Sequence, residues 1–154
     1  MNIYKYDIVF QEVPNHISLA FYVCGCPLKC EGCHSPELWS VSQGTKLSWE
    51  LYRNLLRQYH DKADCILFLG GEWNQAELIE FLKEARAQGY KTALYTGLED
   101  IPKAISENLH FLKTGPWKTA LGGLQSPTTN QIFYDLTTQK KLNYLFQTEI
   151  KEPL

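Results

Sequence analysis

The chain has 154 residues, of which 44% are hydrophobic and 13% aromatic, which is enough for one domain with a real core and too few for two. Fifteen basic residues against seventeen acidic ones leave a net charge of −2, so the sequence carries no electrostatic signature of a nucleic-acid or anionic-membrane partner. We therefore expect a single domain over residues 1–154 whose partner is a protein or a small molecule.

The N-terminal residues MNIYKYDIVFQEVP lack the basic segment and the following apolar run of a secretory signal. No stretch of the sequence approaches 18 uninterrupted apolar residues, so no membrane span is expected. These features predict a cytoplasmic protein. The cytosol is reducing, and clustered cysteines there hold metals more often than disulfides.

Beyond the N-terminal stretch, apolar runs alternate with helical patterns. We expect strands at 17–23, 65–69, 91–96 and 110–114, and helices at 48–60, at 74–89 and within 100–109. In the first helix Ser48 is a candidate N-cap, and Leu51, Leu55 and Tyr59 share one face. The pattern indicates a βαβαβαβ order.

The second helix has its own start and stop signals. Asn74 and Glu77 occupy the N-cap and N3 positions, and Gly89 follows the last helical turn. The residues expected to face inward are Leu78, Ile79, Leu82 and Ala85.

Alternation of this kind predicts an α/β fold with a mostly parallel sheet and right-handed crossovers. A complete eight-unit barrel needs about 250 residues, so we expect an open, incomplete (β/α) barrel of four to five βα units. From residue 115 the sequence is a turn-rich C-terminal tail, in which IFYDL and LNYLF suggest two late strands around the polar turn TTQKK.

Ligands of parallel α/β folds bind at the carboxyl ends of the strands. The segments that follow the four expected strands are rich in glycine or in ligating side chains: CGCPLKCEGCH, GGEW, YTG and KTGPW. We expect all four to face one rim with a wide mouth.

Four of the five cysteines lie at positions 24, 26, 30 and 33, too close together for a disulfide framework. Structural zinc usually takes two C-x2-C pairs separated by a longer loop, and the second pair is missing. Cys26-x3-Cys30-x2-Cys33 instead suits three irons of a [4Fe–4S] cluster whose fourth iron stays open. The spacing favours iron–sulfur over zinc.

The remaining two cysteines have other interpretations. Cys24 is either a fourth ligand or a small buried thiol, and Pro27 pushes Cys26 into an extended conformation that strains a return of Cys24 to the same metal. Cys65 begins a core strand and is expected to be buried.

The GGEW segment at 70–73 directly follows the second expected strand. Two glycines there let the backbone approach a ligand closely, and Glu72 is an acceptor suited to an ammonium group. A tight turn with a solvated glutamate in the first helical turn is the alternative.

The C-x3-C-x2-C loop after the first strand and the GGE motif after the second resemble the radical S-adenosylmethionine superfamily. The short length, GCHSPELW and LKTGPW followed by LGGLQSPTTNQ resemble the activating proteins of anaerobic ribonucleoside-triphosphate reductase. The resemblance spans nearly the whole chain.

The resemblance implies that Cys26, Cys30 and Cys33 bind the cluster, while the amino and carboxylate groups of S-adenosylmethionine chelate the open iron. It also implies three groups of S-adenosylmethionine contacts: Gly70, Gly71 and Glu72 at the amino group; Gly32, Cys33 and His34 along the nucleoside; Tyr95, Thr96 and Gly97 near the ribose or adenine. Many members place an aromatic residue where this chain has Gly32, so adenine packing must come from elsewhere. His34 is a candidate for that role, or it caps the following turn.

The activity implied is reductive cleavage of S-adenosylmethionine, with an external one-electron reductant, to form a glycyl radical on the large subunit of anaerobic ribonucleoside-triphosphate reductase. The alternatives are an activase of pyruvate formate-lyase, a small electron-transfer iron–sulfur protein and a zinc-stabilised interaction module. The wide mouth favours a macromolecular substrate that closes it. An exposed glycine fits, because its α-carbon radical is stabilised by the flanking amide groups.

Several large side chains and one lysine have less specific interpretations. We expect Trp39, Trp49 and Trp73 to pack in the core, as aromatic residues commonly do. Trp117 lies in the turn-rich rim segment and is a candidate partner contact. Lys113 is expected to meet either a carboxylate at the mouth or bulk solvent.

Overall fold

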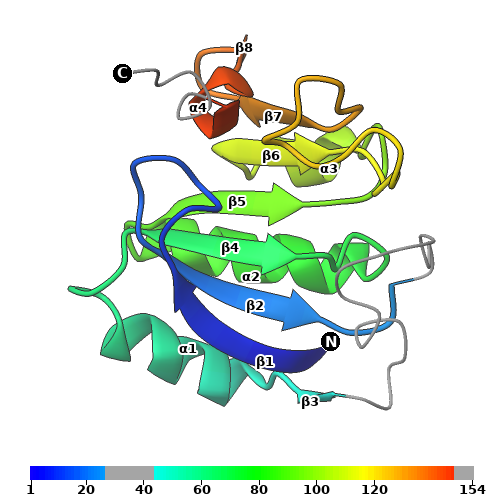
Figure 1. Ribbon diagram of the computed structural model, residues 1–154. Helices are drawn as coiled ribbons and strands as arrows, with labels where there is room; N and C mark the ends of the chain where they lie inside the picture. Colours follow the sequence, from blue (N-terminus) through cyan, green and yellow to red (C-terminus); the bar gives the residue numbers. More distant parts are fainter. Residues whose placement is uncertain (27–43, 148–154) are drawn as a thin grey trace.

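A computed structural model describes residues 1–26 and 44–147. They form one eight-stranded sheet in the order β3-β1-β2-β4-β5-β6-β7-β8 (Figure 1). The strands are β1 (Asn2–Val9), β2 (Ser18–Val23), β3 (Thr45–Lys46), β4 (Cys65–Leu69), β5 (Lys91–Tyr95), β6 (Phe111–Thr114), β7 (Ile132–Asp135) and β8 (Lys140–Lys141). The helices are α1 (Trp49–Gln58), α2 (Gln75–Ala87), α3 (Lys103–Ser106) and α4 (Tyr144–Gln147).

The four central strands β2, β4, β5 and β6 are parallel, and α1, α2 and α3 lie between them in the chain. This confirms the predicted α/β fold with its βαβαβαβ order. The pairs at both edges of the sheet are antiparallel: β1 with β2 and β3, and β7 with β6 and β8. The parallel part is therefore the centre of the sheet, and it carries the strand exits predicted to form the rim.

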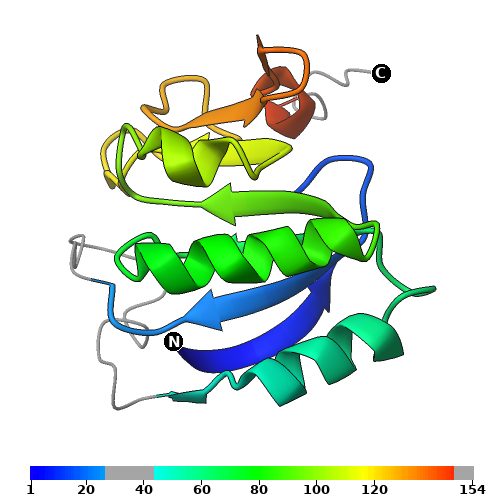
Figure 2. The same cartoon turned by 180° about the vertical axis from the view of Figure 1, so that it is seen from behind.

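Helices α1, α2 and α3 cover one face of the sheet (Figure 2). Their buried residues join the strand residues Phe21, Phe68 and Leu94 in one apolar cluster. Tyr52 sits at the centre of this layer, with its ring 4.4 Å from that of Phe81 and its hydroxyl donating to the Phe81 carbonyl at 2.6 Å. Burial on this scale anchors both long helices to the sheet.

The start of α1 agrees with the prediction from the sequence, but the face of the helix that packs on the sheet is shifted by one residue. Ser48 caps the helix by accepting from the Leu51 N–H at 3.1 Å, as predicted. Leu51, however, is 36% exposed, and the buried residues are Tyr52, Leu55 and Leu56. The expected Leu51 face was wrong because Tyr52 has the larger apolar ring and fills the space over the sheet.

The start of α2 differs from the prediction. Asn74 occupies the N-cap position without a side-chain capping bond, and Glu77 pairs instead with the N-terminal ammonium group of Met1 at 2.6 Å. Gly89 ends the helix in the left-handed region at φ +92°, as expected. The pair between Met1 and Glu77 ties β1 to α2 across the rim end of the sheet.

The opposite face of the sheet is covered by loops and by the C-terminal segment (Figure 1). Val13 from the β1–β2 connection, together with Leu124, Leu142 and Phe146 from the C-terminal segment, packs on Ala20, Leu67, Ala93 and Phe133. No helix shares this face with the central strands apart from the single turn of α4 in the described part of the chain. This face is therefore covered by loops and one short helix rather than by a layer of long helices.

The expected late strand LNYLF is wrong. Residues Tyr144–Gln147 form α4, and the strand that pairs with β7 is Lys140–Lys141, inside the expected turn. Asn143 explains the change, because its side chain accepts from the Phe133 N–H at 2.8 Å and donates to the Gln131 carbonyl at 2.9 Å. These bonds replace a strand ladder, so the chain turns away at Asn143.

No described helix is long and apolar enough to cross a membrane.

Candidate functional site

The exits of the parallel strands meet at one rim. A methyl group placed on Gly71, just after β4, would lie 3.4 Å from Val23 Cγ2 at the end of β2. The Gly70 N–H donates to the Tyr95 carbonyl at the end of β5 at 2.9 Å. Beyond β5 and β6 the Gly115 N–H donates to Leu98 O at 2.8 Å. The predicted convergence of the four strand exits is confirmed for the described residues.

Cys26 is the predicted cluster ligand that the structure describes, and it lies partly exposed three residues after β2. Cys30, Gly32, Cys33 and His34 fall outside the described residues, as does Trp39. Cys26 thus follows the exit of β2, the strand that pairs with β4, and this position at the rim suits a ligand of a metal or cluster.

Cys24 and Cys65 are buried thiols. Cys24 is 2% exposed, its N–H donates to the Asn2 carbonyl at 2.9 Å, and its Sγ lies where a side chain at Gly44 would have to go. Cys65 is fully buried, and burial raises the pKa of its thiol to about 12. The prediction for Cys65 is confirmed, and the surroundings of Cys24 favour its interpretation as a small buried side chain.

The two glycines of the GGE motif both need conformations that other residues avoid. Gly70 has φ +92° and Gly71 has φ +110°, in the left-handed region. A methyl group on Gly70 would also lie 2.7 Å from the Trp73 ring. The chain therefore turns sharply at the strand exit, in a backbone conformation that favours glycine at both positions. The Trp73 ring packs against the helix-side core, as does Trp49, which confirms both predictions.

Glu72 is buried rather than solvated, with 9% of its surface exposed, and it precedes α2 by three residues. The alternative of a solvated first-turn glutamate is therefore wrong. Desolvation raises the pKa of the Glu72 carboxyl, while hydrogen bonds from its own N–H and from the Thr96 hydroxyl, and the charge of Lys113, lower it. Its Oε1 is buried and has no hydrogen-bond partner in the described part of the chain. A buried acceptor of this kind suits a cationic ligand group.

The YTG segment after β5 lies next to Glu72. Thr96 is 2% exposed, and its Oγ1 accepts from the Leu98 N–H at 3.1 Å. The Tyr95 hydroxyl donates to the Glu12 carbonyl at 2.6 Å, which ties β5 to the β1–β2 connection. Gly97 follows at the same exit, partly exposed. The structure thus brings Gly70, Gly71, Glu72, Tyr95, Thr96 and Gly97 together at adjacent strand exits.

A cavity of about 750 Å³ opens on the face of the sheet opposite α1, α2 and α3, and sequence reasoning missed it. Two of its residues, Tyr95 and Lys113, come from the central strands, and Trp117 comes from the segment after β6. Four side-chain amides line it, from Gln11, Asn15, Gln125 and Gln131, with Leu124, Leu145 and Phe146 as apolar neighbours. The only signal in the sequence was Trp117 in a turn-rich segment, because the lining comes from five separate parts of the chain.

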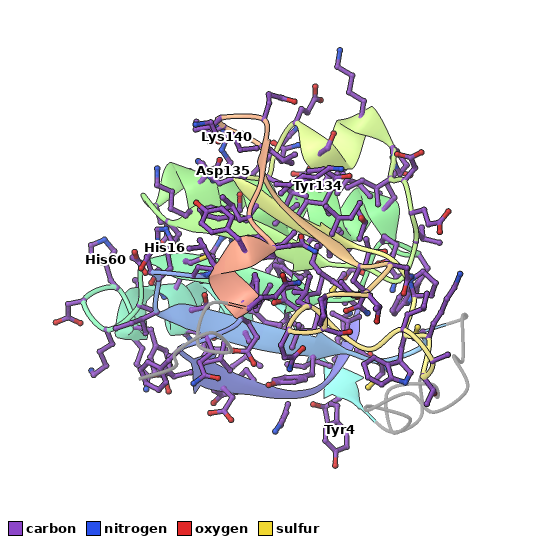
Figure 3. The ribbon with its side chains drawn as sticks, turned by 45° about the horizontal axis from the view of Figure 1, so that its top comes forward. Tyr4, His16, His60, Tyr134, Asp135 and Lys140 are labelled. Carbon is purple, nitrogen blue, oxygen red and sulfur yellow. The ribbon has the colours of Figure 1, made fainter. Side chains whose placement is uncertain are left out.

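The described histidines lie away from the rim. His16, His60 and His110 precede β2, β4 and β6, so they sit at the amino ends of the parallel strands, and Figure 3 shows His16 and His60 together on that side. His16 Nδ1 lies 2.7 Å from the Asp64 carboxylate there. Among the described residues, the ligating chemistry at the rim therefore rests on Cys26 and Glu72.

The open α/β sheet, the cysteine at the β2 exit and the GGE turn at the β4 exit define a radical S-adenosylmethionine type of iron–sulfur domain. The profile of the family described as "4Fe-4S single cluster domain" matches residues 16–132, which is most of the chain, so the chain belongs to this family. Its cofactors are accordingly a [4Fe–4S] cluster and S-adenosylmethionine.

Similarity to a named protein covers a smaller part of the chain than the family match does. The pyruvate formate-lyase-activating enzyme of Clostridium pasteurianum is 41% identical to this chain over 78 residues, which make up 47% of this chain and 33% of that enzyme. The matched segment thus spans about a third of the curated relative. No solved structure matches the chain significantly.

Proposed function

We propose that this chain activates a glycyl-radical enzyme. In this assignment Cys26, Cys30 and Cys33 hold the cluster, and Gly70, Gly71 and Glu72 receive the amino group of S-adenosylmethionine. Tyr95, Thr96 and Gly97 lie near its ribose or adenine, and Gly32, Cys33 and His34 line the nucleoside. When bound, the two cofactors would supply the one-electron reductive cleavage of S-adenosylmethionine to methionine and a 5′-deoxyadenosyl radical, with the electron coming from an external reductant, and this radical chemistry is what hydrogen abstraction from a glycine α-carbon requires.

The observation that carries the proposal is the Glu72 carboxyl. It is buried beside two glycines in the left-handed region, and its Oε1 lacks a partner in the described part of the chain. Leaving such an acceptor unpaired costs about 1–3 kcal/mol, which a ligand ammonium group offsets when it binds. The close approach of Gly71 to Val23 places the residue that precedes Glu72 beside the end of β2, which leads to Cys26.

The cavity supports a macromolecular substrate. Side-chain amides such as Gln125 and Gln131 both donate and accept hydrogen bonds, as a peptide main chain requires, and Leu124, Leu145 and Phe146 supply apolar contact. Lys113 is the only basic side chain in the lining that the structure describes, so the cavity suits an uncharged peptide segment better than a phosphorylated metabolite.

We propose the large subunit of anaerobic ribonucleoside-triphosphate reductase as the partner, on the resemblance of the segments at 112–117 and 121–131. Pyruvate formate-lyase is the second candidate. It is favoured by the 41% identity to a pyruvate formate-lyase-activating enzyme over 78 residues. The two candidates differ in the protein that receives the radical, so the partner can be assigned by direct comparison.

The test is to incubate the cluster-loaded protein anaerobically with S-adenosylmethionine, a one-electron reductant and each candidate partner, and to record the electron paramagnetic resonance spectrum. A glycyl doublet on the reductase subunit supports the first assignment, and a doublet on the lyase alone transfers it to the second. The Cys26→Ser protein is the matched control without an intact cluster loop. Cleavage of S-adenosylmethionine without a doublet on either partner would contradict the proposed function.

A further inference from the structure

Strand β1 leaves most of its outer edge unpaired in the described part of the chain. Its inner edge pairs with β2 from Ile3 to Val9, whereas on the outer side the short β3 pairs only with Asn2 and Ile3 (Figure 1). Residues 4–7 are all exposed, so no other described element buries this stretch. An edge of this kind presents N–H and C=O groups that can pair with another strand.

Large apolar side chains gather along this edge. Tyr4 is 44% exposed, Tyr6 41% and Phe10 65%, and Figure 3 shows Tyr4 pointing away from the sheet. These three make up half of the six exposed large hydrophobic residues in the described part of the chain, although all three lie within residues 4–10. Such a concentration of exposed apolar side chains is typical of an interaction surface. The edge therefore combines unpaired main-chain groups with apolar contact area, as a strand that pairs with another chain requires.

The contacts of the β1 side chains show which face of the sheet each residue occupies. The Tyr6 ring lies 6.4 Å from that of Phe21, on the face covered by the helices. Lys5 Nζ lies 4.7 Å from the centre of the Tyr22 ring, on the opposite face. Because side chains alternate along a strand, Asp7 lies on the same face as Lys5. Two opposite charges therefore share one face, two positions apart, with Tyr6 between them on the other face.

This spacing of charges makes β1 complementary to a second copy of itself. When two copies pair antiparallel about a two-fold axis perpendicular to the sheet, facing residues lie on the same face, so the axis passes through a residue. An axis at Lys5 or at Asp7 would place like charges opposite each other, which destabilises a strand pair. An axis at Tyr4 or at Ile8 would give neither charge an opposite partner. An axis at Tyr6 places Lys5 of each copy opposite Asp7 of the other.

We propose that this chain forms a two-fold symmetric dimer in which β1 pairs antiparallel with β1 of a second copy, with Tyr6 facing Tyr6 and two Lys5–Asp7 pairs between the copies. In the single chain the Ile8 N–H donates to the exposed Asp7 carboxylate at 2.9 Å. In the dimer a carbonyl of the second copy accepts from this N–H, and the carboxylate meets Lys5 of that copy.

The expected dimer is a weak one. Because β3 occupies the edge at Asn2 and Ile3, the contact is limited to residues 4–8 of each strand. A contact of this size suits a reversible association with a dissociation constant of roughly 10–100 µM. The strand residues that line the cavity belong to β5 and β6, which β2 and β4 separate from β1. The proposed dimer therefore does not depend on the proposed function.

The test is sedimentation equilibrium of the full, cluster-loaded chain under anaerobic conditions, at concentrations from about 1 to about 500 µM. We expect a monomer at the lowest concentration and mostly dimer at the highest. Lys5→Asp and Asp7→Lys each place like charges opposite each other, so each should weaken the association by about tenfold or more. An equimolar mixture of the two variants should restore it, because each chain then meets one of opposite charge pattern.

Further variants separate this register from a general effect of charge. The double variant with Lys5→Asp and Asp7→Lys exchanges the two charges and should associate like the wild-type chain. Lys83→Asp reverses an exposed charge on α2 and should leave the association unchanged. Circular dichroism and the Tm of each variant show that it is folded.

Three outcomes would overturn the proposal. The first is a wild-type chain that stays monomeric at the highest concentration, which would leave this edge to a strand of a different protein. The second is a dimer that neither single charge reversal weakens, since the copies would then meet through another surface. The third is a mixture of the two single variants that does not associate more strongly than each variant alone, since the register about Tyr6 would then be wrong.

Discussion

Replacing Glu72 by glutamine separates ligand binding from stability. The substitution keeps the shape of the side chain and removes its charge. Glu72 is 9% exposed, its Oε1 has no partner in the described part of the chain, and desolvation raises its carboxyl pKa. The free protein therefore bears the cost of burying this group, and the bound ammonium group is expected to offset it.

The expected magnitudes follow from this geometry. A hydrogen bond to a charged group contributes about 1.5–3 kcal/mol, so Glu72→Gln should weaken binding of S-adenosylmethionine roughly 10- to 100-fold. The free energy of unfolding should stay the same or rise by about 1 kcal/mol, because a buried amide costs less than a buried carboxylate. For a chain of this size that corresponds to an increase in Tm of about 2–4 °C at most.

The pH dependence has a defined sign for each quantity. Because the folded-state pKa of Glu72 is raised, the folded protein holds a proton on Glu72 that the unfolded chain has already released, between the ordinary carboxyl value and the raised one. The contribution of Glu72 to stability therefore falls as pH rises through that interval. Affinity for the ammonium group rises through the same interval, because binding needs the carboxylate. Glutamine should remove both slopes.

Anaerobic isothermal titration calorimetry on the cluster-loaded protein measures the affinity, and scanning calorimetry measures the Tm. Glu80→Gln, on the exposed face of α2, is the matched control and should alter neither. Wild-type affinity in Glu72→Gln would refute the role given to the carboxyl. A parallel loss of affinity and stability would show that Glu72 is a structural group rather than a ligand-binding one.

Two further pairs of substitutions test the rim. Cys26→Ser should abolish the cluster, measured by iron and sulfide content and by the visible absorption spectrum. Cys24→Ser should spare the cluster, because the Cys24 thiol is buried beside Gly44. Loss of the cluster in Cys24→Ser would contradict the three-cysteine ligand set. Gly71→Ala and Gly89→Ala both place a side chain at positive φ and should each lower the free energy of unfolding in urea by about 1–2 kcal/mol. Only Gly71→Ala, where the new methyl group meets Val23, should also weaken S-adenosylmethionine binding, and equal affinities in the two variants would argue against ligand contact at the β4 exit.

Much of the central sheet was predictable because its strands are continuous apolar runs. CILFL at 65–69 is buried on both faces between β2 and β5, and a segment of this composition has few alternatives. Strand β1, whose outer neighbour in the described part of the chain is the two-residue β3, was not assigned, because in Asn2–Val9 only Ile3 is buried and polar residues alternate with exposed tyrosines. Edge strands depend on their neighbour for pairing, so local composition specifies them weakly.

The errors in the C-terminal segment have a tertiary cause. The apolar pattern of LNYLF is compatible with a strand, but Phe146 contacts the Phe133 ring at a centroid distance of 5.2 Å, and Asn143 satisfies the backbone of β7 with its side chain. Both contacts depend on residues ten or more positions away. Local propensity could not indicate them, and packing decided the outcome.

The candidate site was partly predictable for a topological reason. Parallel strands place their exits at one edge, so Glu72 and Thr96 could be assigned to one rim without knowledge of any side-chain contact. The burial of Glu72 and the engagement of Lys113 with Thr96 and Gly115 were not predictable, because they depend on how closely three loops approach each other.

The rim and the cavity share two residues, and this constrains how a substrate approaches. Lys113 lines the cavity and binds Thr96 at the rim, while Tyr95 lines the cavity and ends β5 two residues before Gly97. Helices α1, α2 and α3 occupy the other face of the sheet, so a partner that enters the cavity meets the loops and the C-terminal segment that line it. A peptide segment in the cavity would thus lie against the same residues that organise the S-adenosylmethionine site. Under the proposed function, partner binding and cofactor binding should therefore be energetically coupled, and each should strengthen the other.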